Sequence, residues 1–168
     1  MSEYRYGKGL RVPYVPTPIP VVDYMLRLAN VGPNDVVYDL GCGDGRIPIR
    51  AVELFNAKKA VCVELRDDLY EKALESVRSR GLEGRVQVVH ADMFDVDISE
   101  ATVITLFLLT SVNKALKPKL ESELRSGVRV VSHEFEIPGW QPVEVRLFFD
   151  GILNHKVYLY VVGKPRSK

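Results

Sequence analysis

The residues best placed to do chemistry lie in a glycine loop, Asp39-Leu40-Gly41-Cys42-Gly43-Asp44-Gly45-Arg46, between an apolar β-branched run and a helical segment. Glycines in a strand-to-helix turn let the backbone approach a ligand, and the helix that follows points free N–H groups at it. The spacing is Gly-x-Gly-x-Gly, whereas loops that bind a dinucleotide pyrophosphate have Gly-x-Gly-x-x-Gly. Asp39 would repel a pyrophosphate, so we predict a ligand that carries positive charge.

S-adenosylmethionine fits this description, because it presents an ammonium and a sulfonium group. We therefore predict that it is the cofactor and that S-adenosylhomocysteine is the product. The residues expected to bind it in the loop are Asp39, Gly41, Gly43 and Gly45.

Polar side chains at two further strand ends agree with this prediction. Glu64 ends the next β-branched run, where a carboxylate can accept both ribose hydroxyls. Asp92 follows the third run and would accept from the adenine amino group, with Leu65 and Met93 packed on the ring. A strand-end salt bridge for Glu64 and an ordinary turn role for Asp92 are the alternatives.

The elements that must position these residues alternate between β-branched runs and helical segments, as in a parallel sheet with helical crossovers. The runs are 36–40, 60–64, 86–89, 102–107 and 128–132, and the helices are 46–55, 67–80 and 111–126, the last interrupted at Pro118. Thr17 is expected to cap an earlier helix that begins at Pro18. Two more runs, 143–149 and 155–162, are joined by too short a turn for a crossover helix.

These elements predict an α/β fold with a Rossmann-like, seven-stranded, mostly parallel sheet and a C-terminal antiparallel hairpin. Residues 1–168 are expected to form a single domain, because 168 residues suit one sizeable core. Residues 1–16 carry Pro13, Pro16 and several tyrosines, so they are expected to form an extended N-terminal arm.

Composition argues against several classes of partner. The 23 basic and 22 acidic residues nearly cancel, which disfavours a dedicated nucleic-acid binder. The sequence shows no apolar leader and no run long enough to span a bilayer, which predicts a cytoplasmic protein without a membrane partner. Cys42 and Cys62 show neither metal-ligand spacing nor a disulfide framework, so we expect neither a metal nor a disulfide.

The glycine loop, Glu64 and Asp92 together resemble the motifs of class I methyltransferases. A closer similarity, to the archaeal protein-lysine methyltransferases of Crenarchaeota, extends over nearly the whole chain. It is carried by Pro13-Tyr14-Val15-Pro16-Thr17-Pro18, Asp97-Ile98-Ser99-Glu100-Ala101-Thr102, Phe107-Leu108-Leu109-Thr110, Lys117-Pro118-Lys119-Leu120 and Val130-Val131-Ser132-His133-Glu134-Phe135-Glu136. The resemblance implies a monomeric enzyme of broad specificity that methylates exposed lysines of proteins. It also implies that Tyr14 and Thr17 close over the methionine end of the cofactor.

Methyl transfer to a lysine needs an uncharged amine placed in line with the S–CH₃ bond. A free lysine has a pKa of about 10.4, but an apolar channel and the nearby sulfonium both lower it, so a strong general base is not obligatory. Phe107 is predicted to wall the acceptor channel, and Glu134 is a candidate to guide the ammonium, with a solvated loop charge as the alternative. For His133 a structural role and a catalytic role both stay open, and Trp140 either rims the site or pins the C-terminal hairpin.

Three other functions share some of these sequence features. A methyltransferase for RNA or a small molecule would use the same cofactor half, although near-neutral charge argues against RNA, and the Asn-Pro-Pro-Tyr motif that holds planar amino groups is absent. A non-catalytic cofactor-binding module would also keep the loop and both strand-end carboxylates. An NAD dehydrogenase is excluded by the glycine spacing.

Overall fold

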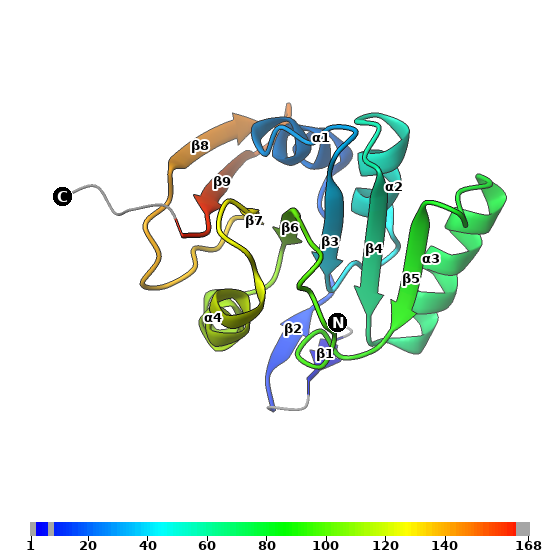
Figure 1. The fold of residues 1–168 in the computed structure, drawn as a ribbon, viewed down its shortest axis with the longest axis horizontal. Helices are drawn as coiled ribbons and strands as arrows, with labels where there is room; N and C mark the ends of the chain where they lie inside the picture. Colours follow the sequence, from blue (N-terminus) through cyan, green and yellow to red (C-terminus); the bar gives the residue numbers. More distant parts are fainter. Residues whose placement is uncertain (1–2, 7–8, 164–168) are drawn as a thin grey trace.

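A computed structural model of the chain describes residues 3–6 and 9–163. These residues form a seven-stranded sheet and a separate two-stranded sheet (Figure 1). The strands are β1 (Glu3–Arg5), β2 (Arg11–Pro13), β3 (Val36–Leu40), β4 (Lys59–Glu64), β5 (Val86–His90), β6 (Val103–Leu106), β7 (Arg129–His133), β8 (Glu144–Phe149) and β9 (Asn154–Val161). The helices are α1 (Ile19–Leu28), α2 (Arg46–Glu53), α3 (Asp67–Ser79) and α4 (Thr110–Glu123).

The large sheet has the strand order β5-β4-β3-β6-β7-β9-β8, and its first five strands are parallel. The order reverses between β3 and β6, which is where open α/β sheets bind ligands, at the carboxyl ends of the strands. β9 pairs antiparallel with both β7 and β8, because the turn between β8 and β9 leaves no room for a helix. The predicted fold is therefore confirmed.

Each face of the sheet has its own apolar core. Met25 and Leu26 of α1 are fully buried in one core, together with residues of α2. Leu116 and Leu120 of α4 are fully buried in the other core. The helices α1 and α2 thus cover one face of the sheet and α4 covers the opposite face (Figure 1). None of the helices in the part of the chain described here has the length and apolarity needed to cross a membrane.

The N-terminal arm differs from the prediction. Residues Glu3–Arg5 pair antiparallel with Arg11–Pro13, so the arm forms a hairpin instead of a single extended segment. Residues 1, 2, 7 and 8 of the predicted arm lie outside the described residues. The hairpin lies beyond the carboxyl ends of β3 and β4 (Figure 1), which brings the arm to the predicted site.

Two details of the predicted helices are also wrong. Thr17 does not cap α1: the N-cap residue is Pro18, without a side-chain cap, and the Thr17 hydroxyl instead pairs with His133. Pro118 does not interrupt α4, which runs continuously through it. A proline inside a helix costs about 3 kcal/mol, but burial of Leu116 and Leu120 on either side contributes about 1.5–3 kcal/mol each, so the helix persists.

Candidate cofactor site

The glycine loop between β3 and α2 is held against β4 by its backbone. The N–H groups of Gly41 and Cys42 both donate to the carbonyl of Val63, at 2.9 and 3.0 Å. Gly41 and Gly43 have φ values of +78° and +61°, a left-handed conformation that favours glycine. Both glycines line a pocket between the loop and the N-terminal arm, which we call the loop pocket.

Gly45 has a different role from the other two glycines. It is the N-cap of α2, with φ +85°, and it is not among the residues that line the loop pocket. A Cβ atom at Gly45 would lie 3.2 Å from the Cβ of Ala73 in α3. The third glycine therefore allows α2 and α3 to pack closely, and its contact with the cofactor stays a prediction.

A disulfide between Cys42 and Cys62 fastens the glycine loop to β4, which corrects the expectation of two unpaired cysteines. The two cysteines are separated by 20 residues, a spacing that suggests nothing by itself, but the loop folds back over β4 and brings their Cα atoms to 5.2 Å. The reduced cysteines expected of a cytoplasmic protein are therefore not observed, and the cysteines no longer support that location.

Asp39 supplies a buried carboxyl group to the loop pocket. Its exposed fraction is 3%, and it lies on β3 opposite Thr105 of β6. Burial raises the pKa of Asp39 to about 7; the charges of Glu64 and Asp44 add to this effect and the Thr105 side chain opposes it. A cation bound in the pocket would stabilise the ionised form, so the site fits the ammonium group of S-adenosylmethionine.

Glu64 holds the loop in place. It is fully buried, and its two carboxylate oxygens accept from the N–H groups of Gly43, at 2.7 Å, and Arg66, at 2.9 Å. These two bonds give Glu64 a role in clamping the backbone of the loop. Binding of ribose hydroxyls by Glu64 stays a prediction.

The residues predicted for the adenine end lie outside the loop pocket. The Asp92 carboxylate accepts from the N–H of Phe94 at 2.9 Å, a bond typical of the turn role that was the alternative for Asp92. Met93 is buried in the core with an exposed fraction of 1%, and Leu65 packs partly buried against the same core. Adenine binding by Leu65, Asp92 and Met93 therefore stays a prediction.

Two tyrosines of the arm fill the cleft above the loop, and one of them, Tyr6, was not predicted. The Tyr14 ring lies over Gly43, with its Cε1 2.8 Å from where a Cβ would stand. Tyr6 is buried, and its hydroxyl lies 3.2 Å from the equivalent position on Gly41. Burial raises the pKa of Tyr6, and the carboxylates of Glu64, Asp92 and Asp39 raise it further. Tyr6 thus lies among the carboxylates predicted to bind the cofactor, and a tyrosine-rich arm was the only signal for it.

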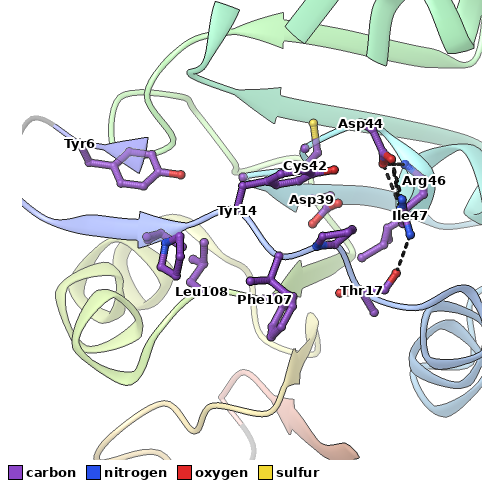
Figure 2. Close-up of a pocket in the computed structure, with 16 residues that line it drawn as sticks. Tyr6, Tyr14, Thr17, Asp39, Cys42, Asp44, Arg46, Ile47, Phe107 and Leu108 are labelled. Atoms are coloured by element: carbon purple, nitrogen blue, oxygen red, sulfur yellow. Dashed lines mark hydrogen bonds and ion pairs between the residues drawn. The ribbon is translucent and has the colours of Figure 1, made fainter. Parts of the chain in front are cut away.

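The arm leaves little free space in this conformation. The loop pocket has a volume of about 40 Å³, enough for a few water molecules. Arg46 fixes the arm by donating to the Asp44 carboxylate, at 2.7 Å, and to the carbonyl of Thr17, at 3.0 Å (Figure 2). S-adenosylmethionine is larger than this volume, so we expect the arm to move when the cofactor binds.

The acceptor side of the pocket is built by the segment after β6. Phe107 and Leu108 line the pocket (Figure 2). The Phe107 ring packs on His133 with centroids 4.0 Å apart. Glu134 is exposed, does not line the pocket, and accepts from the N–H of Lys156 at 3.3 Å. The structure therefore brings Phe107 to the site and leaves Glu134 at its margin.

Of the two roles predicted for Trp140, its contacts support the structural one. Its indole N–H donates to the carboxylate of Glu121 at 3.1 Å, and its ring packs edge-on against Tyr160. It therefore pins the segment before the C-terminal hairpin to α4 and β9.

Taken together, the sheet reversal beside β3, the glycine loop and the buried Asp39 carboxyl define a class I S-adenosylmethionine-dependent methyltransferase. A solved structure of similar fold supports the cofactor: an RNA methyltransferase from Salinibacter ruber in complex with S-adenosylhomocysteine is 44% identical, with a TM-score of 0.84, and the match covers 92% of this chain and 97% of that one. The Bacillus subtilis tRNA methyltransferase TrmK, 17% identical with a TM-score of 0.72, shows the same fold.

The sequence model of the ANTKMT methyltransferase domain matches residues 39–144, and the chain belongs to this family. A relative named protein-lysine N-methyltransferase, from Saccharolobus islandicus, is 60% identical over 155 residues, which cover 92% of this chain and 96% of the relative. A mouse relative named adenine nucleotide translocase lysine N-methyltransferase is 36% identical, and the match covers 81% of this chain and 58% of the relative.

Proposed function

We propose that this enzyme transfers methyl groups from S-adenosylmethionine to lysine ε-amino groups of proteins, with broad substrate specificity. The observation that carries the proposal is the 60% identity, over almost the full length of both chains, to the Saccharolobus protein-lysine N-methyltransferase. The mouse relative, named for lysine methylation of another protein, supports the same acceptor atom.

The geometry of the pocket suits a lysine acceptor. Phe107, Leu108, Pro13 and Pro16 line one part of it with apolar surface. Such surface lowers the pKa of a lysine amine by desolvation, and a bound sulfonium lowers it further. Asp39 lies in the same pocket, where it can hold the cofactor ammonium. Methyl transfer then depends mainly on holding amine and sulfonium in line.

The experiment is methyl transfer from radiolabelled S-adenosylmethionine to a heat-treated protein extract, followed by mass spectrometry of the labelled residues. We expect label on lysines with the wild-type chain and none with Asp39→Ala. Asp97→Ala is the matched control, because Asp97 is exposed at a turn outside the loop pocket. Cofactor binding without lysine label would contradict the proposal.

RNA is the second candidate acceptor, because the 44% identical Salinibacter protein is described as an RNA methyltransferase. The net charge of +1 argues against it, since RNA binding relies on an excess of Lys and Arg. Adding total RNA and a small-molecule extract to parallel reactions decides the matter. Label in either fraction, with none in protein, would reassign the acceptor, and binding without any transfer would favour a non-catalytic module.

We also infer that residues 1–168 act as one monomeric domain, with neither a stable nucleic-acid partner nor a membrane partner, and that the protein is cytoplasmic. Light scattering of the purified chain and its cofractionation with ribosomal and membrane fractions test these points.

A further inference from the structure

Four polar side chains from distant parts of the sequence form one continuous chain of hydrogen bonds behind the loop pocket. The Thr17 hydroxyl lies 3.2 Å from Nδ1 of His133, and Nε2 of His133 lies 2.8 Å from Nδ1 of His155. Nε2 of His155 lies 2.7 Å from Oδ2 of Asp150 in the β8–β9 turn. Thr17 lines the pocket, and the exposed fractions of Thr17, His133 and His155 are 3%, 2% and 8%.

The Asp150 end of the chain sets the direction of every bond. The Asp150 carboxylate accepts from the N–H groups of Leu153 and Ile152 and from His155, which lowers its pKa to about 2. An ionised carboxylate only accepts, so Nε2 of His155 carries a proton. With both imidazole rings neutral, Nδ1 of His155 then accepts from Nε2 of His133. Nδ1 of His133 must then accept from the Thr17 hydroxyl, which leaves the oxygen lone pairs of Thr17 for the pocket.

We infer that the acceptor amine loses its proton through this chain, which we call the proton relay: Thr17, His133, His155 and Asp150. The inference rests on the proposed lysine methylation. Thr17 is the catalytic group, because it lines the pocket in which the amine would bind, and the other three position its proton and receive it.

The transfer balances as a series of proton shifts. The ammonium N–H bond breaks and an O–H bond forms on Thr17, while the original Thr17 proton moves to Nδ1 of His133. The Nε2 proton of His133 moves to Nδ1 of His155, which becomes an imidazolium paired with the Asp150 carboxylate. The amine is left neutral. The Nε2 proton of His155 then leaves to solvent along Asp150, which is only partly buried, and both rings must regain their Nε2–H tautomers by proton exchange with solvent before the next turnover.

The charges around the relay favour this direction. Burial lowers the pKa of His133 to about 4, with a smaller contribution from His155, so His133 is neutral at rest and passes the proton on. The Glu134 carboxylate and the two imidazole rings offer atoms within 4.8 Å of one another. Glu134 is therefore a second anion that would stabilise the imidazolium, and it accepts from the backbone N–H of Lys156. On the Thr17 side, Asp39 lines the same pocket and Arg46 donates to the Thr17 carbonyl.

His133, Glu134 and His155 are also close enough to hold a metal ion. In this arrangement, however, Nε2 of His133 and Nδ1 of His155 bond to each other, and a metal would have to break that bond. The relay therefore predicts that activity is unchanged by a chelator, and activity that requires added Zn²⁺ would overturn it.

Asp150→Asn is the sharpest test, because an NH₂ group in place of one carboxylate oxygen reverses the direction of the hydrogen bonds in the relay. Oδ1 can keep the turn bonds, while the new NH₂ donates to Nε2 of His155. Both histidines then switch tautomer, and Thr17 becomes a donor toward the pocket. Nitrogen-15 imidazole spectra of the full chain should show Nε2–H tautomers in the wild type and Nδ1–H tautomers in the variant.

In methylation assays, Asp150→Asn should lower kcat about 10²-fold at pH 7, with little change in cofactor Kd. The defect should shrink as the pH rises toward 10, because the substrate lysine then loses its proton to solvent. Thr17→Val should show the same pH-dependent loss, whereas Thr17→Ser, which keeps the hydroxyl, should retain the wild-type pH profile. Asp97→Asn is the control, an exposed turn-forming carboxylate without a histidine partner.

Several results would overturn the relay. These are unchanged tautomers in Asp150→Asn, a loss of rate that is equal at every pH, or an effect confined to KM. An equal pH-dependent loss in Glu134→Gln would move the proton exit from Asp150 to Glu134. If the wild type labels lysine and Asp150→Asn is normal, only the relay fails; if the wild type labels no lysine, the proposed function fails and the relay with it.

Discussion

Replacing Asp39 by asparagine should stabilise the cofactor-free protein at pH 8, although it removes the carboxyl group that we assign to cofactor binding. Burial raises the pKa of Asp39 to about 7, whereas an unfolded aspartate has a pKa of about 3.9. At about 1.36 kcal/mol per pKa unit, the ionised carboxyl costs the folded state about 4 kcal/mol.

The sign of the effect depends on pH. Because the pKa is higher in the folded state, the favourable contribution of Asp39 is complete below about pH 4 and is lost as the pH rises through 7. The free energy of unfolding of Asp39→Asn should therefore equal that of the wild type near pH 4. It should exceed the wild-type value by up to about 4 kcal/mol above pH 7. Urea unfolding of the cofactor-free chain between pH 4.5 and 8.5 measures this difference.

Asp39→Asn should weaken cofactor binding, although it stabilises the cofactor-free protein. A bound ammonium favours ionised Asp39, so S-adenosylmethionine should bind the wild type more tightly as the pH rises to about 7 and should displace a proton below it. Calorimetry in buffers of different ionisation enthalpy detects that proton. Asp39→Asn should bind about 10²-fold more weakly and release no proton.

Asp44→Asn is the control, because its effect on the free energy of unfolding should have the opposite sign. Burial raises the pKa of Asp44, but the bonds and charge of Arg46 lower it overall, so Asp44 contributes stability that is present above pH 4 and lost as the pH falls through its folded pKa. Its replacement should therefore destabilise the protein at pH 8. Equal destabilisation by Asp39→Asn at pH 5 and pH 8 would contradict a cost of ionising the buried Asp39 carboxyl.

Three further results are expected. Gly43→Ala should lower the free energy of unfolding by about 1–2 kcal/mol because of its left-handed backbone, and by more because its Cβ would collide with the Tyr14 ring. A double-mutant cycle with Tyr14→Ala should therefore show coupling in denaturant unfolding, and additive effects would contradict the contact. Glu64→Gln should lower the free energy of unfolding by about 1–3 kcal/mol, because one backbone N–H then faces an amide NH₂, and an unchanged midpoint would exclude the clamping role. Reducing the Cys42–Cys62 disulfide should cost about 3 kcal/mol for its 20-residue separation, measured by unfolding with and without reductant; thiol titration that finds two free cysteines before reduction would contradict the bond.

The sheet and the loop were predictable because their signals are local. A strand such as β3, buried along most of its length, appears in the sequence as a β-branched run, and the carboxyl ends of parallel strands necessarily meet at one edge. Asp39, Gly41 and Gly43 were found in this way. Tyr6 and the disulfide were not, because their contacts depend on how the arm and the loop fold back over the sheet.

The proton relay lay beyond sequence reasoning because its bonds join residues up to 116 positions apart. The β7–β9 register places His133 opposite Val157, so that His155 comes to the same face. That register is fixed by burial, since Val130 and Tyr160 face one core while Val131 and Val157 face the other. A slip of one residue would turn every β9 side chain to the wrong face and break the bond between the histidines. The packing that determines the fold therefore also places the relay behind the pocket.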